Sequence, residues 1–237
     1  MTNILKTLLI GCCTMLLGSC FEFEQSVELQ RNGSGEFELV VRVPDMDGAD
    51  PDDGFMSEEE ANAQAEASGV EILENSVARA NGKVTSKIRI AFDNVDELNA
   101  FMQKPGEEGS DAPNFVFSLE KNGGESTFTH KVIPAQKAGA ADADTQMGEL
   151  MLANMLKDSY YSIRWILPGE VLRASDGATI EGSEVSFKVP MVALMNGSGV
   201  DVSATYESGL AAWSLYLIGG AVLVGLIVVL PRLRKKS

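Results

Sequence analysis

The stretch 21-FEFEQSVELQRNGSGEFELVVRV-43 decides the fold, because apolar and polar side chains alternate along it on both sides of a glycine-rich turn. Its first run has one face of Phe21, Phe23, Gln25, Val27 and Leu29, and the other face carries Glu22, Glu24 and Glu28. Residues 32–35, Asn-Gly-Ser-Gly, separate this run from the second. Alternation with a period of two indicates half-buried strands. Two such strands around an Asn-Gly turn predict a β-hairpin.

Similar patterns continue along the chain and predict one domain with few helices. Ser57 and Glu60 form the capping-box pattern that opens an Ala-rich helix, and Asn94 begins a second helix that runs to Met102. Residues 145–157 have apolar side chains at helical spacing, which predicts the main amphipathic helix. Further strands are predicted at 70–73, 84–92, 115–120, 126–133, 160–167, 171–173, 183–189 and 200–206. This order, without regular βαβ units, predicts an α+β fold with a largely antiparallel sheet and two or three helices.

The N-terminus, residues 1–19, has the features of a signal peptide. Lys6 lies in a short polar start, and an apolar run at 7–17 follows that is too short to span a bilayer. Leu17-Gly18-Ser19-Cys20 resembles the bacterial lipobox, in which the cysteine thiol takes a diacylglycerol and the peptide is cut before that cysteine. Cys20 is therefore the predicted lipidation site. The alternatives are an ordinary cleaved signal and an uncut signal anchor.

The C-terminus predicts a second membrane attachment. Residues 210–231 include an uncharged run about as long as a helix needs to cross a hydrocarbon core, and residues 232–237 are basic. A basic tail of this kind stays in the cytoplasm. We expect residues 20–209 to form an extracytoplasmic domain at the plasma (inner) membrane, with 210–231 as a transmembrane helix. A buried globular helix is the alternative reading of this run.

The charge of the predicted domain excludes several partners. All 34 Asp and Glu fall between Glu22 and Glu207, with 14 of the 19 Lys and Arg, because Lys6 and four tail residues lie outside. The resulting net charge of −20 repels phosphate backbones, so nucleic acid is not an expected partner. The three cysteines leave no pair for a disulfide, since Cys12 and Cys13 depart with the signal.

No motif for catalysis is present. Hydrolysis needs a nucleophile and a base within reach of each other, and His130, the one histidine, alternates with Phe128 and Val132 along a predicted strand. We interpret it as a packing or surface residue. With one imidazole and no thiol in the domain, zinc is not expected. The sequence predicts a non-enzymatic protein without a cofactor.

Calcium is the one metal with a sequence argument, because an acidic loop concentrates hard oxygen ligands. The EF-hand spacing is nevertheless broken: Ala49 occupies the place of the third ligand and Asp50 that of the glycine. A solvated acidic loop is the simpler interpretation. The candidate ligands are Asp45, Asp47, Asp50, Asp52 and Asp53.

Taken together, these features resemble the LppM-like domain family of bacterial membrane-anchored lipoproteins. The resemblance is carried by the lipobox at Cys20, the turn at 32–35, Leu-Pro-Gly-Glu-Val at 167–171, Ile-Glu-Gly at 180–182 before Phe187, and the C-terminal apolar run. It implies a compact α+β envelope domain that binds lipids or glycolipids, with no catalytic residues. The acidic loop and the Ala-rich helix depart from the family pattern.

Two functions remain open from the sequence. In the first, an amphipathic helix and the sheet enclose a lipid or glycolipid, with Met147, Leu150, Met151 and Met155 as possible lining residues. These side chains could equally fill an ordinary core. In the second, the domain is a structural or adaptor protein of the envelope that docks a protein partner.

Overall fold

The structure, a computed structural model, describes residues 21–45, 56–103, 114–133, 156–157, 159–195 and 199–209. It confirms the predicted first hairpin. Strand β1 (Glu22–Leu29) pairs antiparallel with β2 (Gly35–Pro44), with Val27 opposite Phe37. Gly35 lies where the two strands approach closely, since a Cβ there would overlap the carbonyl oxygen of Glu28.

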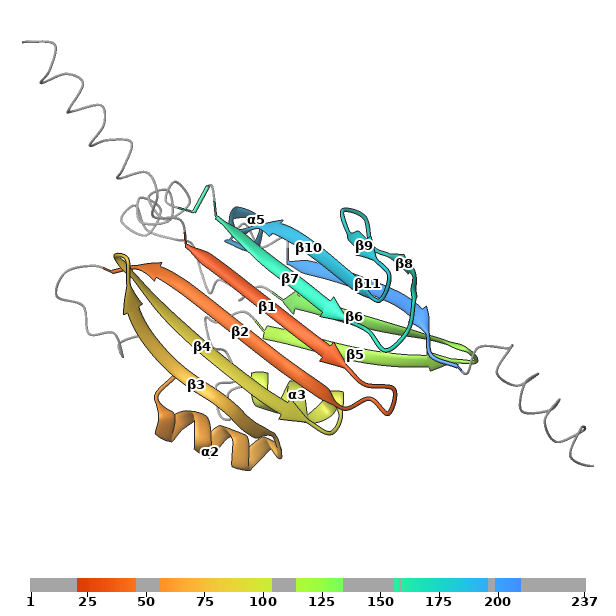
Figure 1. Cartoon of the computed structure of the whole chain (residues 1–237), viewed down its shortest axis with the longest axis horizontal. Coiled ribbons are helices and arrows are strands. Elements are labelled where there is room, and N and C mark those ends of the chain that lie inside the picture. Colours follow the sequence, from red (N-terminus) through yellow and green to blue (C-terminus); the bar gives the residue numbers. More distant parts are fainter. Residues whose placement is uncertain are drawn as a thin grey trace, which may run out of the picture.

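This hairpin lies at the centre of a large sheet with the strand order β3-β4-β2-β1-β7-β10-β9 (Figure 1). Strands β1 and β7 are parallel, with Glu22 opposite Tyr160, whereas the other strand pairs within the described residues are antiparallel. The further strands are β3 (Glu71–Ala80), β4 (Lys83–Phe92), β7 (Tyr160–Ile166), β9 (Thr179–Glu181) and β10 (Glu184–Pro190).

A second, smaller sheet faces the first and has the order β5-β6-β11-β8. The strands predicted at 115–120 and 126–133 are confirmed, and they form a hairpin of β5 (Asn114–Asn122) and β6 (Glu125–Ile133). Strand β11 (Val200–Glu207) pairs with β6 on one side and with the short β8 (Val171–Ala174) on the other. The inward side chains of the two sheets form one apolar core.

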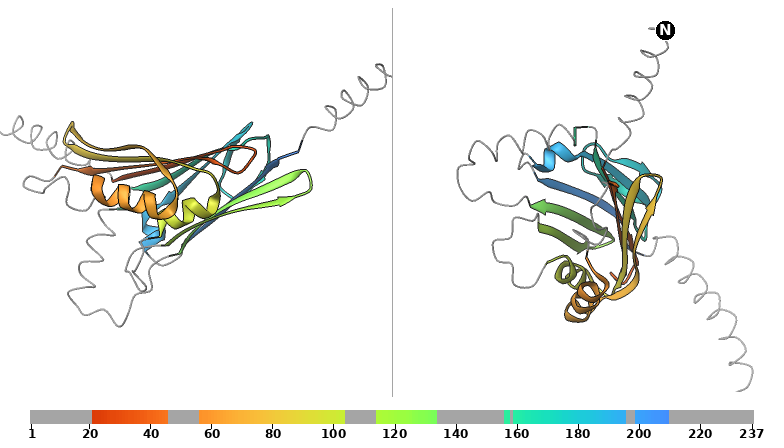
Figure 2. Two further views of the ribbon diagram at one scale, coloured as in Figure 1. Left: turned by 90° about the horizontal axis from the view of Figure 1, so that it is seen from below. Right: turned by 90° about the vertical axis from the view of Figure 1, so that its left-hand side faces the viewer.

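Two helices close one side of this sandwich. Helix α2 (Glu58–Ser68) has the predicted capping box and contacts edge strand β3, while α3 (Val95–Met102) contacts both α2 and edge strand β5. Asn99 of α3 holds the β5 backbone: its amide donates to the carbonyl of Phe117 at 2.8 Å and accepts from the Phe117 N–H at 2.7 Å. On the other side, the chain passes directly from β8 to β9 and so joins the two sheets. The interior is therefore enclosed on both flanks (Figure 2).

The predicted α+β class is wrong. The described residues form two β-sheets that face each other, with only α2, α3 and the short α5 (Met191–Met195) beside them. The physical reason is that alternation identifies a strand without showing which sheet it joins, so β8 could not be assigned to a second sheet. Of the predicted helix at 145–157, residues 145–155 lie outside the described residues and 156–157 form a turn.

The predicted transmembrane helix is not supported. None of the helices among the described residues is long and apolar enough to cross a membrane. Residues 210–231, on which that prediction rested, lie outside the described residues, as do the predicted signal peptide and the basic tail.

Candidate functional site

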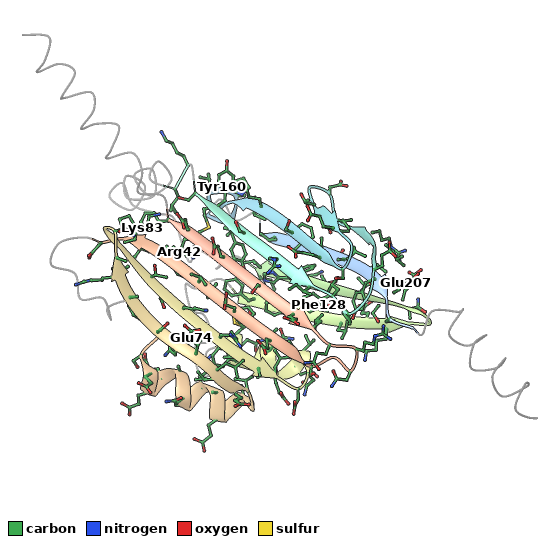
Figure 3. The ribbon with its side chains drawn as sticks, viewed as in Figure 1. Arg42, Glu74, Lys83, Phe128, Tyr160 and Glu207 are labelled. Carbon is green, nitrogen blue, oxygen red and sulfur yellow. The ribbon has the colours of Figure 1, made fainter. Side chains whose placement is uncertain are left out.

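The two ends of the sandwich are built differently, and we name them by their connections. At the turn end, short turns follow β1 at Leu29, β5 at Asn122 and β7 at Ile166. At the loop end, β1 begins at Glu22 and β7 at Tyr160. The labelled side chains show this separation, with Lys83, Arg42 and Tyr160 near one end and Glu207 near the other (Figure 3).

Burial falls from the turn end to the loop end along β1, β2 and β10, whereas on β6 and β7 it does not, since Val132 and Tyr161 near the loop end are each 3% exposed. On β1 the inward side chain of Leu29 is 3% exposed, whereas Phe23 is only half-buried. On β2, Phe37 is 1% exposed and the next inward residue, Leu39, is half-buried. Strand β10 repeats this between buried Phe187 and half-buried Val189. The inward apolar side chains of these three strands are therefore more accessible near the loop end than at the turn end.

Several strands that adjoin the longer stretches of sequence between elements begin or end at the loop end. Strand β2 ends there at Pro44, β6 ends there at Ile133, and β5 and β7 start there. Cys20 precedes β1 by two positions, so a lipid on this cysteine would be attached at the same end. The half-buried apolar side chains and the predicted lipidation site thus share one end of the domain.

Polar side chains lie inside the core near this end. Gln25 of β1 is 2% exposed and faces inward between Phe23 and Val27. The Tyr161 hydroxyl donates a hydrogen bond to the Gln25 Oε1 atom. This bond orients the amide and leaves its Nε2 amine buried without a hydrogen-bond partner. Burial also raises the pKa of Tyr161, which keeps this phenol neutral.

His130 of β6 lies beside the same tyrosine. Its ring stacks on Phe117, with centroids 4.4 Å apart and planes 11° from parallel, and it meets the Tyr161 ring edge-on at 6.2 Å. Neither ring nitrogen has a hydrogen-bond partner, and the side chain is fully buried. Burial lowers the pKa of His130 to about 3, so the imidazole is neutral at physiological pH. A neutral imidazole offers one donor and one acceptor.

We call Gln25, Tyr161 and His130 the polar cluster. Buried polar atoms in folded proteins nearly always have a partner, and exceptions call for an explanation such as a ligand or bound water. Towards the turn end, the Trp165 indole N–H is also buried without a partner, between Phe128 and Phe187. The cluster therefore offers unused hydrogen-bonding groups within an aromatic, apolar setting.

The outer face of the large sheet has a different character, because opposite charges alternate across its strands. Glu22 forms ion pairs with Lys83 at 2.6 Å and with Arg42 at 3.2 Å. Lys87 forms ion pairs with both Glu38 and Glu74, each at 3.0 Å. The hydrogen bond from Lys83 lowers the pKa of Glu22. This face is a solvated lattice of ion pairs, which stabilises only modestly.

The outer face of the small sheet is instead marked by hydroxyl groups. Ser118, Thr129 and Ser203 lie opposite one another on β5, β6 and β11, and Ser175 continues the row at 3.1 Å from Ser203. In the next row, Thr127 and Thr205 hydrogen-bond at 2.9 Å. We call these six residues the hydroxyl face.

Most residues singled out from the sequence lie outside the described residues. This holds for Cys20, for Asp47, Asp50, Asp52 and Asp53, and for Met147, Leu150, Met151 and Met155. Asp45 is described and pairs with Arg79 at 3.4 Å. Within the described residues, no three acidic, histidine or cysteine side chains form a group that could hold a metal ion.

Sequence reasoning missed the polar cluster. Gln25 had one usable signal, since it is a polar residue on the otherwise apolar face of an alternating strand. Tyr161 and His130 carried no signal, because nothing in the sequence shows that β6 packs across from β7.

Comparison with known proteins gives one structural likeness. No family model and no curated protein matches the chain. Among solved structures, the folded domain of the Mycobacterium tuberculosis protein LppM, determined by NMR, matches with a TM-score of 0.46 and 17% sequence identity. The match covers 80% of this chain and 91% of that one. This is a distant likeness, and it leaves the LppM-like character of the chain as a resemblance rather than a family membership.

Proposed function

We propose that this chain is a non-enzymatic lipoprotein of the cell envelope whose β-sandwich receives the acyl part of a lipid or glycolipid through the loop end. The fall in burial from Leu29 to Phe23 on β1, repeated on β2 and β10, carries the proposal. Half-buried apolar side chains that continue into a buried core suit an acyl chain, because each methylene removed from water contributes about 0.8 kcal/mol.

The place of the N-terminus supports the same proposal. With only Phe21 between Cys20 and β1, a diacylglycerol on Cys20 would hold the loop end close to the membrane. A bilayer lipid would then have a short path into the sandwich. Residence at the plasma membrane, with the domain on the extracytoplasmic side, is part of the same proposal, and the signal-like residues 1–19 before Cys20 support export.

Attachment at Cys20 is tested by metabolic labelling. The wild-type chain should incorporate labelled palmitate, and Cys20→Ser should not. Equal labelling of the two proteins would contradict lipidation at this residue.

Lipid entry is tested by fluorescence quenching in the full chain. Trp165 and Trp213 are the two tryptophans, so a Trp213→Phe background leaves Trp165 as the only emitter. In nanodiscs that contain lipids brominated near the chain end, quenching of Trp165 is expected, because its ring is fully buried between the sheets. Unquenched Trp165 emission would contradict the proposal.

A matched pair of variants locates the entrance. Val43 faces inward at the loop end, whereas Thr85 lies one strand away on the outer face, opposite Arg42. Val43→Asp places a charge in the proposed entrance and should reduce quenching, while Thr85→Asp should not. Equal quenching in both variants would place the entrance elsewhere.

A second function, docking of a protein partner, is favoured by the hydroxyl face. Its central row carries no charged side chain, so less desolvation is needed there than on the ion-paired face. Ser203→Lys should abolish cross-linking to such a partner in intact envelopes. Unchanged cross-linking would exclude this face as the docking surface.

A further inference from the structure

We infer that Gln25, Tyr161 and His130 bind a neutral carbonyl group, an ester or amide at the head of an acyl chain, and that they exclude carboxylate and phosphate from the interior. This inference rests on the proposed function and names the chemical class of the ligand.

The first reason is the orientation of Gln25. Its Oε1 atom is occupied by the Tyr161 hydroxyl, so the amide presents its Nε2 amine as a buried donor without an acceptor. A carbonyl oxygen is the acceptor that an amide N–H ordinarily binds in proteins. Tyr161 is therefore a positioning residue, which selects the donor end of the amide.

The second reason is the state of His130. Stacking against Phe117 holds the plane of the ring, and burial keeps the ring neutral. One nitrogen can then donate to a carbonyl, and the other can accept from a hydroxyl on the same ligand. Both nitrogens are free for these bonds, since neither has a partner in the described residues.

The third reason is the absence of interior charge in the described part of the chain. The buried polar residues there are Gln25, Ser126, His130, Ser159 and, on the hydroxyl face, Thr205, and none of them carries a charge. Burying an anion without a cation costs several kcal/mol. A ligand with a phosphate or carboxylate would therefore keep this group outside, at the loop end.

The position of Gln25 along β1 agrees with a carbonyl inside the domain and a charged group outside it. Gln25 lies two residues inward from half-buried Phe23, a distance of about 7 Å in an extended strand. A carbonyl could reach the cluster while a larger head group remains at the mouth. The chain would then enter the apolar core beyond it only by displacing packed side chains such as Val27 and Trp165, which are 1% and 0% exposed.

The experiment compares two lipids that differ only in the carbonyl. The full-length Trp213→Phe protein in nanodiscs is loaded with a brominated lipid that quenches Trp165. A 1,2-diacylglycerol and the 1,2-dialkylglycerol of the same chain length then compete for the site. The ester should displace the probe at about tenfold lower concentration than the ether, as expected for a net gain of one or two hydrogen bonds.

Variants of the polar cluster test whether its side chains cause the preference for the ester over the ether. Gln25→Leu and His130→Phe keep the approximate shape of each side chain and should reduce the ester preference to about onefold. Ser126→Ala changes another buried polar residue, at the turn end, and should retain it. Where Gln25→Leu fails to fold, Tyr161→Phe removes only the hydroxyl that orients the amide and should weaken the preference.

The outcomes separate the two proposals. If ester and ether displace the probe equally in the wild-type protein, the carbonyl site is wrong while lipid binding stands. An ester preference that persists in both cluster variants also overturns the inference. If the probe never quenches Trp165, then water or the chain itself occupies the interior, and both proposals fail.

Discussion

The turn end and the loop end of the sandwich use the same strands but close them to different degrees. At the turn end, Leu29, Phe92 and Leu167 are each 3% exposed. At the loop end, Phe23, Leu39 and Val189 remain half-buried although they continue the same inward rows. Along β1, β2 and β10, the turn end is therefore closed, whereas the loop end retains accessible apolar side chains.

The largest effect is expected from substitutions on β2, where a single strand has both a fully buried and a half-buried inward residue. Phe37→Ala on β2 should lower the free energy of unfolding by about 3 to 5 kcal/mol, because it leaves a cavity in a fully packed region. Leu39→Ala, two residues towards the loop end, should cost about half as much or less. Urea denaturation of the two variants measures the difference. Equal losses would show that the loop end is packed as fully as the turn end.

The second effect concerns His130, which lies between the two ends. Its pKa of about 3 in the folded protein is below the value of about 6.5 expected in the unfolded chain. The unfolded state therefore binds the proton first, and stability falls as the pH drops from about 6.5 towards 3. The loss amounts to about 4 kcal/mol across this window.

Carboxylates also contribute to the loss of stability at low pH, so the contribution of His130 must be separated from theirs with a variant. Glu22, whose pKa is lowered, also loses its stabilising contribution as the pH falls. His130→Phe retains that carboxylate contribution, so the difference between the wild-type and variant pH profiles isolates the imidazole. Parallel profiles would mean that His130 is already solvated or hydrogen-bonded in the folded protein.

The third effect tests how closely the turn end is packed. A Cβ at Gly169 would overlap the carbonyl oxygen of Glu207, so Gly169→Ala should destabilise the fold by about 1 to 3 kcal/mol. Gly124 at the same end has no atom within 4 Å of such a Cβ, and Gly124→Ala is the matched control. A similar melting temperature for both variants would show that β11 can move away from Gly169.

The smallest effect comes from the surface of the large sheet. Arg164 holds Glu184 by two hydrogen bonds of 2.7 Å, yet both side chains are more than a third exposed. Glu184→Gln should therefore cost less than about 1 kcal/mol. Glu22→Gln at the loop end should cost somewhat more, since Glu22 has two cationic partners. Thermal unfolding at low and high salt measures both, and a larger loss for Glu184→Gln would reverse the ranking.

Local structure was predictable from the sequence where one segment carries the whole signal. The first hairpin, the capping box at Ser57 and the helix that begins after Asn94 are confirmed. Each depends on neighbours within a few residues. The alternation around His130 likewise predicted a strand, and the structure places this residue on β6.

The pairing of strands far apart in the sequence was not predictable. The wrong fold class and the missed polar cluster both follow from this. The division into two sheets depends on β8 joining β11 rather than β7, and a four-residue strand contains no pattern that specifies its partner. The polar cluster depends in turn on β1, β6 and β7 meeting in the core. Gln25 could be flagged as an exception on an apolar face, but its partner Tyr161 could not.

The parallel pairing of β1 with β7 has a consequence for how the chain is made. Strand β1 is synthesised before the other described strands. Its second edge stays uncovered until β7, which begins at Tyr160, has been synthesised and pairs with it. Contacts so distant along the chain form slowly, and uncovered strand edges recruit other chains. A nascent chain that stalls before residue 160 would therefore expose the centre of its largest sheet, which makes it a substrate for chaperones and proteases.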